Sequence, residues 1–250
     1  MTGLLTALLF ISCEKSFDSK TTQQTNFNGS SIGQVYVAMV GAAGNQLAVD
    51  ANQLTGAAMV SGSVFPTTGY GFVMAPGIRA FTLTGTSPQV PITFAENMQA
   101  GKHHTIFIYD TITSPKQKTV VDNIIVPADT TARIRFANFV FSKFAVPAID
   151  IFSRRRNANV ATNLQVSDVS DYVTFASGLT DTLVVRSTGT TVDLMNITPP
   201  TPTPGNLPVP VQVIFTPTQK RSYTVIFRGS YSINGTTTAN VRTLSVFANY

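Results

Sequence analysis

The sequence predicts an all-β protein made of two tandem antiparallel β-sandwich domains. Three observations lead to this prediction. From residue 34 onward the chain consists of short runs rich in Val, Ile, Phe, Tyr and Thr, separated by turn-forming residues. No long window shows the 3.6-residue periodicity of an amphipathic helix. Several of the runs also recur, in the same order, about 100 residues later.

The clearest runs alternate between apolar and polar side chains. In ARIRFAN (132–138), Ile134 and Phe136 fall on one face and Arg133 and Arg135 on the other. The same alternation is found in VPVQVIF (209–215) and RSYTVIFRG (221–229). One polar and one apolar face is typical of antiparallel sheets and not of a parallel α/β core.

Four segments of the first part recur in the second part. The matched pairs are 34–40 with 133–139, 47–53 with 147–153, 70–86 with 172–190, and 102–110 with 220–230. The offset grows to 119 at the last match, where Thr105 pairs with Thr224. The proline-rich stretch 198–210 accounts for most of this growth and is expected to be a loop, because proline cannot donate to a strand ladder.

The repeat predicts two domains of matching topology, at 34–127 and 131–250. About 100 residues and about seven strands each suit an immunoglobulin-like or transthyretin-like sandwich. Superposing the copies is expected to place Val35 on Ile134. The alternative is one large sandwich with fortuitous internal similarity.

The composition favours an extracytoplasmic protein. Only 12% of the residues are charged, about half the usual share of roughly 25%. The net charge is +5, but the basic residues are scattered and the acidic ones are few, so we expect no nucleic-acid partner. The high apolar content excludes a disordered chain.

The amino terminus predicts secretion and lipidation. The apolar run 4–11 is too short to span a bilayer but has the length of a signal-peptide core. Phe10-Ile11-Ser12-Cys13 resembles a bacterial lipobox, in which the cysteine becomes the lipidated first residue. We therefore expect a signal peptide at 1–12, and a lipidated Cys13 with a flexible tether at 13–33. The alternative is that Cys13, the single cysteine, is an ordinary free thiol.

These features predict a location at the bacterial outer membrane. The lipid at Cys13 would make the membrane a partner, on either the periplasmic or the cell-surface side. Cys13-Glu14-Lys15 is similar to the start of many Bacteroidetes lipoproteins.

The second copy is similar to the bacterial family called domain of unknown function 4397. The matching residues are Ala132 to Phe136, Ala148 to Phe152, Ser167 to Tyr172, and Gly178. The first copy fits more loosely. The resemblance implies secreted or surface lipoproteins with β-sandwich modules, and it implies no reaction. Where the family has small residues after the first strand, this chain has NFVFSKF (138–144).

The sequence contains no recognisable catalytic or metal-binding constellation. His103 and His104 are adjacent and would point to opposite faces of a strand, and the only glutamates are Glu14 and Glu96. Neither a phosphate-binding loop nor a G-x-S-x-G elbow is present. We therefore predict no enzyme, no cofactor and no metal site.

Asp50 and Asp150 stand at the same place in the two copies and are expected to superpose. Each carboxylate is expected to accept backbone hydrogen bonds at a strand end. The alternative is a repeated ligand or calcium contact, although calcium needs several oxygen ligands.

Two groups of residues are candidate ligand contacts. Arg154, Arg155 and Arg156 are expected at a hairpin tip, either simply solvated or gripping anionic glycans or lipid headgroups. Three phenylalanines are expected in the core, or on a contact surface if exposed: Phe139, Phe141 and Phe144.

The sequence thus predicts a non-catalytic surface lipoprotein acting in adhesion or ligand binding. The expected partner is a glycan or a surface protein. The alternative is a structural subunit of a fimbrial-type polymer, in which 241–250 would be donated to a neighbour as a strand. That segment would otherwise be the closing strand of the second domain.

Overall fold

The computed structural model describes residues 29–124, 126–196, 208–232 and 240–250. The predicted signal peptide, Cys13 and most of the tether lie outside the described residues, as does most of the proline-rich stretch. The predicted all-β fold is confirmed, because the described residues form strands and no helix. Consequently none of them forms a helix able to cross a membrane.

The first domain consists of nine strands in two sheets. They are β1 (Ser31–Val37), β2 (Gln46–Val49), β3 (Asn52–Gln53), β4 (Val64–Phe65), β5 (Phe72–Met74), β6 (Gly77–Thr84), β7 (Ile92–Met98), β8 (His103–Thr111) and β9 (Ser114–Asp122). One sheet, here called the inner sheet, has the order β4-β1-β8-β9, with β5 also paired to β1. The outer sheet has the order β3-β2-β6-β7.

The second domain has the same plan. Its strands are β10 (Thr131–Asn138), β11 (Ile149–Ser153), β12 (Ala158–Leu164), β13 (Val173–Ala176), β14 (Asp181–Ser187), β15 (Met195–Asn196), β16 (Val209–Pro210), β17 (Gln212–Phe215), β18 (Ser222–Arg228) and β19 (Thr243–Ala248). The inner sheet is β13-β10-β18-β19 and the outer sheet is β12-β11-β14-β17. Strands β15 and β16 form a separate short pair.

Each inner sheet contains one parallel pair, which the antiparallel prediction missed. Strand β1 is parallel to β8, and β10 is parallel to β18. Alternation shows that one face of a strand is apolar, but it does not show the direction of the neighbour. The first strand lies in a different sheet from the second, so the order is not that of immunoglobulin domains. It fits the transthyretin-like alternative.

The ladder registers correct the predicted superposition by two residues. Gln34 is opposite Thr105, and Arg135 is opposite Thr224. Placing Thr105 on Thr224 therefore places Gln34 on Arg135, so Val35 corresponds to Phe136 and not to Ile134. A shift of two residues keeps every side chain on the same face, which is why the sequence pattern did not reveal it.

The tether ends earlier than predicted, because Ser31 to Gly33 already belong to β1 and pair with β5 and β8. Ser31 and Gly33 are small, and the single apolar residue between them, Ile32, gave no alternating pattern. Gly33 leaves room for the neighbouring strand, since a Cβ there would lie 2.7 Å from the side chain of Met74 and 2.9 Å from that of Phe72, and those side chains would have to shift.

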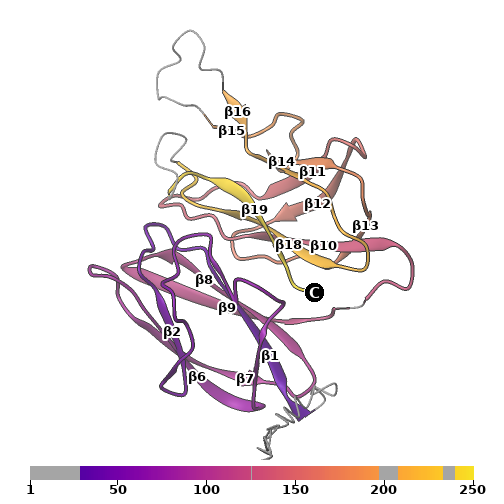
Figure 1. The fold of residues 1–250 in the computed structure, drawn as a ribbon. Coiled ribbons are helices and arrows are strands. Elements are labelled where there is room, and N and C mark those ends of the chain that lie inside the picture. Colours follow the sequence, from indigo (N-terminus) through magenta and orange to yellow (C-terminus); the bar gives the residue numbers. More distant parts are fainter. Residues whose placement is uncertain (1–28, 125, 197–207, 233–239) are drawn as a thin grey trace, which may run out of the picture.

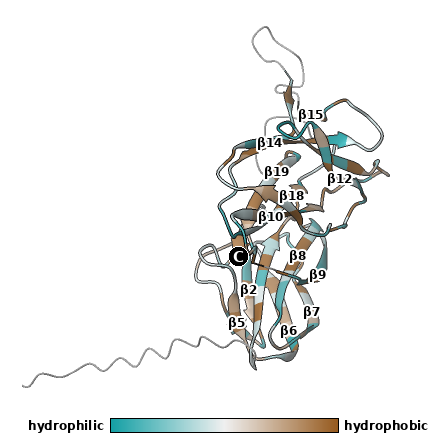
Figure 2. Cartoon of the chain, turned by 90° about the vertical axis from the view of Figure 1, so that its right-hand side faces the viewer, coloured by the Kyte–Doolittle hydropathy of each residue, from teal (hydrophilic) through white to brown (hydrophobic). Residues whose placement is uncertain are grey.

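Each domain has its own apolar core between its two sheets. In the first domain the core includes Val35, Leu47, Phe81 and Ile106; in the second it includes Phe136, Ile151, Val185 and Val225. Figure 2 shows hydrophobic and hydrophilic residues alternating along the strands of both domains.

The two domains are stacked through their inner sheets, giving four layers of sheet (Figure 1). A third apolar cluster fills this contact and includes Tyr36, Phe107, Phe139, Ile226 and Phe247. The ring centroids of Phe107 and Phe139 lie 4.5 Å apart, and those of Tyr36 and Phe247 lie 4.9 Å apart. The face of β10 that carries Arg135 is therefore buried against the first domain.

Candidate functional site

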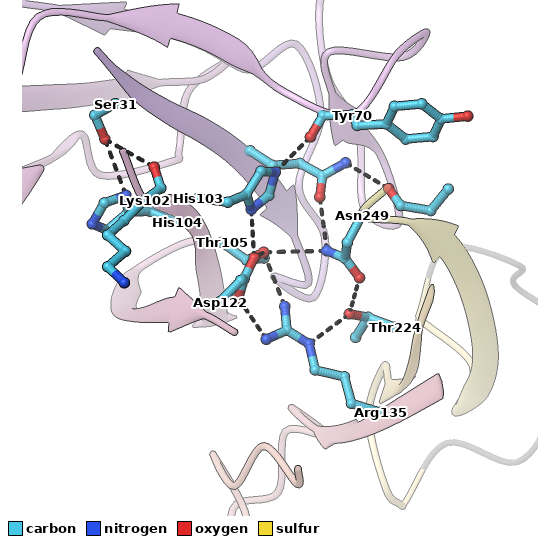
Figure 3. A network of polar contacts seen from close by, with 12 residues as sticks. Ser31, Tyr70, Lys102, His103, His104, Thr105, Asp122, Arg135, Thr224 and Asn249 are labelled. Carbon is cyan, nitrogen blue, oxygen red and sulfur yellow. Dashed lines mark hydrogen bonds and ion pairs between the residues drawn. The ribbon is translucent and has the colours of Figure 1, made fainter. Parts of the chain in front are cut away.

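A buried polar network joins the domains beside the apolar cluster (Figure 3). At its centre is Asp122, the last residue of β9, whose side chain is fully buried. Its carboxylate accepts hydrogen bonds from Arg135 Nη1 at 2.5 Å and from Thr105 Oγ1 at 2.5 Å, and it lies 2.6 Å from His103 Nδ1. A charge buried on one domain is thus neutralised by a charge buried on the other.

The network continues through amide and hydroxyl groups. Arg135 Nε donates to Thr224 Oγ1 at 2.8 Å, and Arg135 Nη2 donates to Thr105 Oγ1 at 2.9 Å. The side chain of Asn249 donates to Gln34 Oε1 at 2.9 Å and accepts from Thr224 Oγ1 at 2.6 Å. The threonines matched in the sequence repeat therefore meet at the contact between the domains.

The network has the reciprocal pairing of a twofold-symmetric interface. The ladder registers make Gln34 equivalent to Arg135, and they make Asp122 equivalent to Asn249. The contact of Arg135 with Asp122 therefore has its mirror counterpart in the contact of Gln34 with Asn249. Reciprocal contacts of this kind define an isologous interface. The chain is built like a homodimer whose halves have been joined.

A second pair of contacts joins each domain to the equivalent turn of the other, but through residues that are not equivalent. The turns 60–63 and 165–168 are equivalent, since the amide of Val60 donates to Ser63 Oγ and that of Gln165 donates to Asp168 Oδ2. Lys118, on β9 of the first domain, reaches the second turn, and Arg228, on β18 of the second domain, reaches the first. The contacts are Lys118 Nζ to the carbonyl of Ser167 at 2.6 Å, and Arg228 Nη1 to Ser61 Oγ at 3.4 Å.

Burial and charge act in opposite directions on Asp122. Burial by itself raises its pKa, but the charge of Arg135 and the hydrogen bond from His103 outweigh it and lower the pKa below its ordinary value. Removing one partner from a buried pair of this kind costs about 3–5 kcal/mol, since the other charge is left uncompensated.

The two histidines serve structural contacts on opposite faces of β8, as their adjacency predicted. His103 Nδ1 faces Asp122, and its Nε2 lies 2.6 Å from the carbonyl oxygen of Tyr70. His104 Nε2 accepts from the amide of Gln99, so Nδ1 carries the proton and donates to Ser31 Oγ at 3.1 Å. Burial lowers the pKa of His104.

A groove of about 370 Å³ opens at another place on the domain junction. Three segments form it: the β8–β9 hairpin of the first domain, and the β10–β11 and β12–β13 loops of the second. Its lining includes Tyr109, Val140, Phe141, Phe144, Val146 and Val166. Phe144 is 81% exposed and Val166 is 40% exposed, so apolar surface faces solvent here.

One ion pair stands on the wall of this groove. Lys116 Nζ lies 2.6 Å from Asp110 Oδ2, and this contact raises the pKa of Lys116. Asp110 has a positive φ of 77° at the end of β8, which is uncommon for a residue other than glycine.

The three predicted phenylalanines have different environments. Phe139 is fully buried between the domains and cannot contact a ligand, which corrects its place among the candidate contacts. Phe141 is half-buried and lines the groove together with Phe144. Phe139 therefore belongs to the core, whereas Phe141 and Phe144 belong to a candidate contact surface.

The predicted arginines lie elsewhere, at the turn between β11 and β12. The phenylalanine loop precedes β11 and the arginine turn follows it, so the two groups are at opposite ends of one strand. Arg154 is ion-paired with Asp193, and the guanidinium of Arg156 lies 3.9 Å from the ring centroid of Phe175. Arg155 and Arg156 line a separate hollow of about 240 Å³.

Asp50 and Asp150 do not superpose, which is a second correction. The amide of Asp50 donates to the carbonyl of Ala80, and the amide of Arg154 donates to that of Thr182, so Asp50 corresponds to Arg154. The predicted match is displaced by four residues, which is again an even number, so each side chain stays on the same face of its strand.

The predicted role of these aspartates is confirmed, because each carboxylate accepts a backbone N–H. The donors are Ala80 to Asp50 at 3.0 Å and Asn163 to Asp150 at 2.8 Å. No group of three or more His, Cys, Asp or Glu in the described ranges is placed to hold a metal ion.

The carboxy-terminal segment forms β19, which pairs with β18 from Tyr223–Ala248 to Arg228–Thr243. This is the closing-strand alternative for 241–250. The next residue, Asn249, is fully buried in the polar network.

Sequence reasoning missed the charged half of both sites. Asp122 and Lys116 were assigned no role, and Arg135 was placed only on the polar face of its strand. A usable signal was the repeat itself, because the copies differ in charge: the sequence matches Gln34 to Arg133, and the ladder registers match it to Arg135.

Neither a scan against models of protein families nor a search of curated proteins found a match to this chain. The resemblance to domain of unknown function 4397 therefore stays a prediction.

Proposed function

We propose that this protein is a non-catalytic binding or adhesion module of a bacterial surface, anchored to the outer membrane through a lipid on Cys13. The groove at the domain junction would be its contact site. The observation that carries the proposal is the exposure of Phe144 and Val166 over this groove, since exposed apolar patches mark interaction surfaces.

The rigid junction supports this proposal. A site made from loops of two domains keeps its shape only when the domains keep their orientation. Here the apolar cluster and the Asp122–Arg135 pair hold the domains together, and the β10–β11 and β12–β13 loops are fixed on that frame.

The non-catalytic part of the proposal is supported by the histidines. Both rings are engaged by structural partners: His103 by Asp122 and the carbonyl of Tyr70, and His104 by Ser31 and the amide of Gln99. General acid–base catalysis relies most often on such side chains.

The test is a binding screen with the full chain immobilised against a glycan array and a panel of surface proteins. We expect a saturable ligand whose binding is lost in Phe144→Ala and kept in Ile78→Ala, which removes a similarly exposed side chain from β6. Binding that both variants keep, or turnover in a hydrolase screen, would contradict the proposal. Mass spectrometry of membrane-derived protein should find the lipid on Cys13. An unmodified Cys13 would contradict the proposed lipid anchor.

The polymer alternative is tested by size-exclusion chromatography of the full chain. Since β19 already pairs with β18, we expect a monomer. Ladders of oligomers that disappear on deletion of 241–250 would favour strand donation instead.

A further inference from the structure

The groove is a departure from the twofold relation between the domains. The register places Tyr109 on Arg228, because Thr105 corresponds to Thr224. On the Arg228 side, the guanidinium lies against Gly62, where a Cβ would be 2.4 Å from Arg228 Nη2. On the Tyr109 side, the ring packs against Phe139 instead, with centroids 4.9 Å apart and the ring planes tilted by 51°. On that side Lys118 contacts the equivalent turn at the carbonyl of Ser167, and the open position lies between Tyr109 and Val166, where the groove is.

A longer loop adds apolar residues at the open position. Residues 139–148 connect β10 to β11, whereas 38–45 connect β1 to β2, so the second loop is two residues longer. The loop is held by backbone hydrogen bonds from Phe141 to Gly229 and from Tyr231 to Phe141. Phe144 is therefore exposed on a segment that is anchored beside it.

The groove continues the apolar contact between the domains. Its floor includes Val140, which is 1% exposed, and Tyr109, which packs on the interdomain cluster. The charges on its wall, Asp110 and Lys116, are paired with each other. The surface therefore attracts apolar groups without requiring a charge on the ligand.

The chemistry of the lining distinguishes between the two expected partners. A sugar would exchange its hydrogen bonds with water for contacts with Val140, Val146 and Val166, which cannot hydrogen-bond through their side chains. The polar side chains of Ser142 and Gln165 also line the groove, and both are engaged within the protein: Ser142 Oγ accepts from the amide of Phe144, and Gln165 Nε2 donates to Asn163 Oδ1. An apolar side chain loses no hydrogen bond on entering the groove and gains about 25 cal/mol for each Å² buried.

We infer that the groove receives an aliphatic or aromatic side chain of a partner protein, with Phe144 packing over it. This inference rests on the proposed function and narrows its ligand from glycan or protein to protein. An aromatic anchor beside a pocket is the usual centre of a protein–protein contact.

The test uses capped tripeptides Gly-Xaa-Gly, which share one backbone and differ only in the central side chain. With Xaa as Phe or Leu, titration into the full chain should shift the methyl NMR signals of Val140, Val146 and Val166 in a saturable way. Dissociation constants near the millimolar range are expected for ligands of this size. With Xaa as Lys or Glu, and with methyl glucoside or methyl galactoside, no saturable shift is expected.

Three variants make the assignment specific. Phe144→Ala should weaken binding of the Phe peptide by about tenfold, in line with the loss of an aromatic anchor. Val166→Asp places a charge in the groove and should abolish the shift. Ile78 lies on the outer sheet of the first domain, so Ile78→Ala should leave the dissociation constant of the Phe peptide unchanged.

The outcomes separate the inference from the proposed function. If the glycosides bind and the Phe and Leu peptides do not, the inference is wrong and the binding module stands as a glycan binder. If the apolar peptides bind equally well to Phe144→Ala and Val166→Asp, the groove is not the site and the inference is wrong. If neither class binds and the screens above also find no ligand, both are wrong.

Discussion

The double substitution Asp122→Asn with Arg135→Gln is expected to be milder than either single substitution. Arg135→Gln leaves the Asp122 carboxylate fully buried without its main counter-charge. Asp122→Asn leaves a guanidinium that is 2% exposed in the same position. The double variant removes both charges and recreates the amide pair that the protein already uses at the equivalent position, between Gln34 and Asn249.

The magnitudes follow from burial. Each single variant should lower the free energy of unfolding by about 3–5 kcal/mol, because one buried charge is left uncompensated. The double variant leaves no unpaired charge, and its hydrogen bonds are neutral ones worth about 1 kcal/mol each. Its loss should therefore be about 1–2 kcal/mol, with an interaction energy of about 3 kcal/mol or more between the two positions.

The assay is urea unfolding at neutral pH of the full chain and its variants. Arg155→Gln is the matched control, since it removes an exposed arginine from the β11–β12 turn and should change the free energy of unfolding by no more than about 0.5 kcal/mol. The reasoning would be refuted if Arg135→Gln behaved like this control. It would also be refuted if the losses of the two single variants simply added in the double variant.

Three further results are expected. The stabilisation from Asp122, whose pKa is lowered on folding, should be fully present above the unfolded pKa of about 3.9 and lost as the pH falls through the lower folded value; in an acid titration the stability of the wild type should therefore approach that of Asp122→Asn, and their difference should be largest at neutral pH. Phe139→Ala should lower the free energy of unfolding by about 3–5 kcal/mol, because its ring is fully buried. Phe144→Ala, five residues away and 81% exposed, should lower it by no more than about 0.5 kcal/mol. Equal losses in thermal unfolding would contradict the assignment of Phe139 to the junction and of Phe144 to the surface. Gly62→Ala should lower the free energy of unfolding by about 1 kcal/mol or more, since the φ of Gly62 is +89° and the added Cβ meets the guanidinium of Arg228. Adding Arg228→Ala to this variant should recover part of that loss in denaturant unfolding.

The sequence by itself determined the strands, the repeat and the plan of the two domains. Alternation in 132–138 and the matches around Thr105 and Thr224 depend on side-chain periodicity and chain order, which are local properties. The tertiary structure decided the register, because shifts of two or four residues preserve the faces and leave the local pattern unchanged. It also decided which polar face is buried: Arg135 lies on the polar face of its own strand, and that face is covered by the first domain, where Asp122 pairs with it. The groove also forms only where segments of the two domains come together. Phe139 and Phe144 belong to one apolar segment, and only the position of the first domain makes one of them core and leaves the other at the surface.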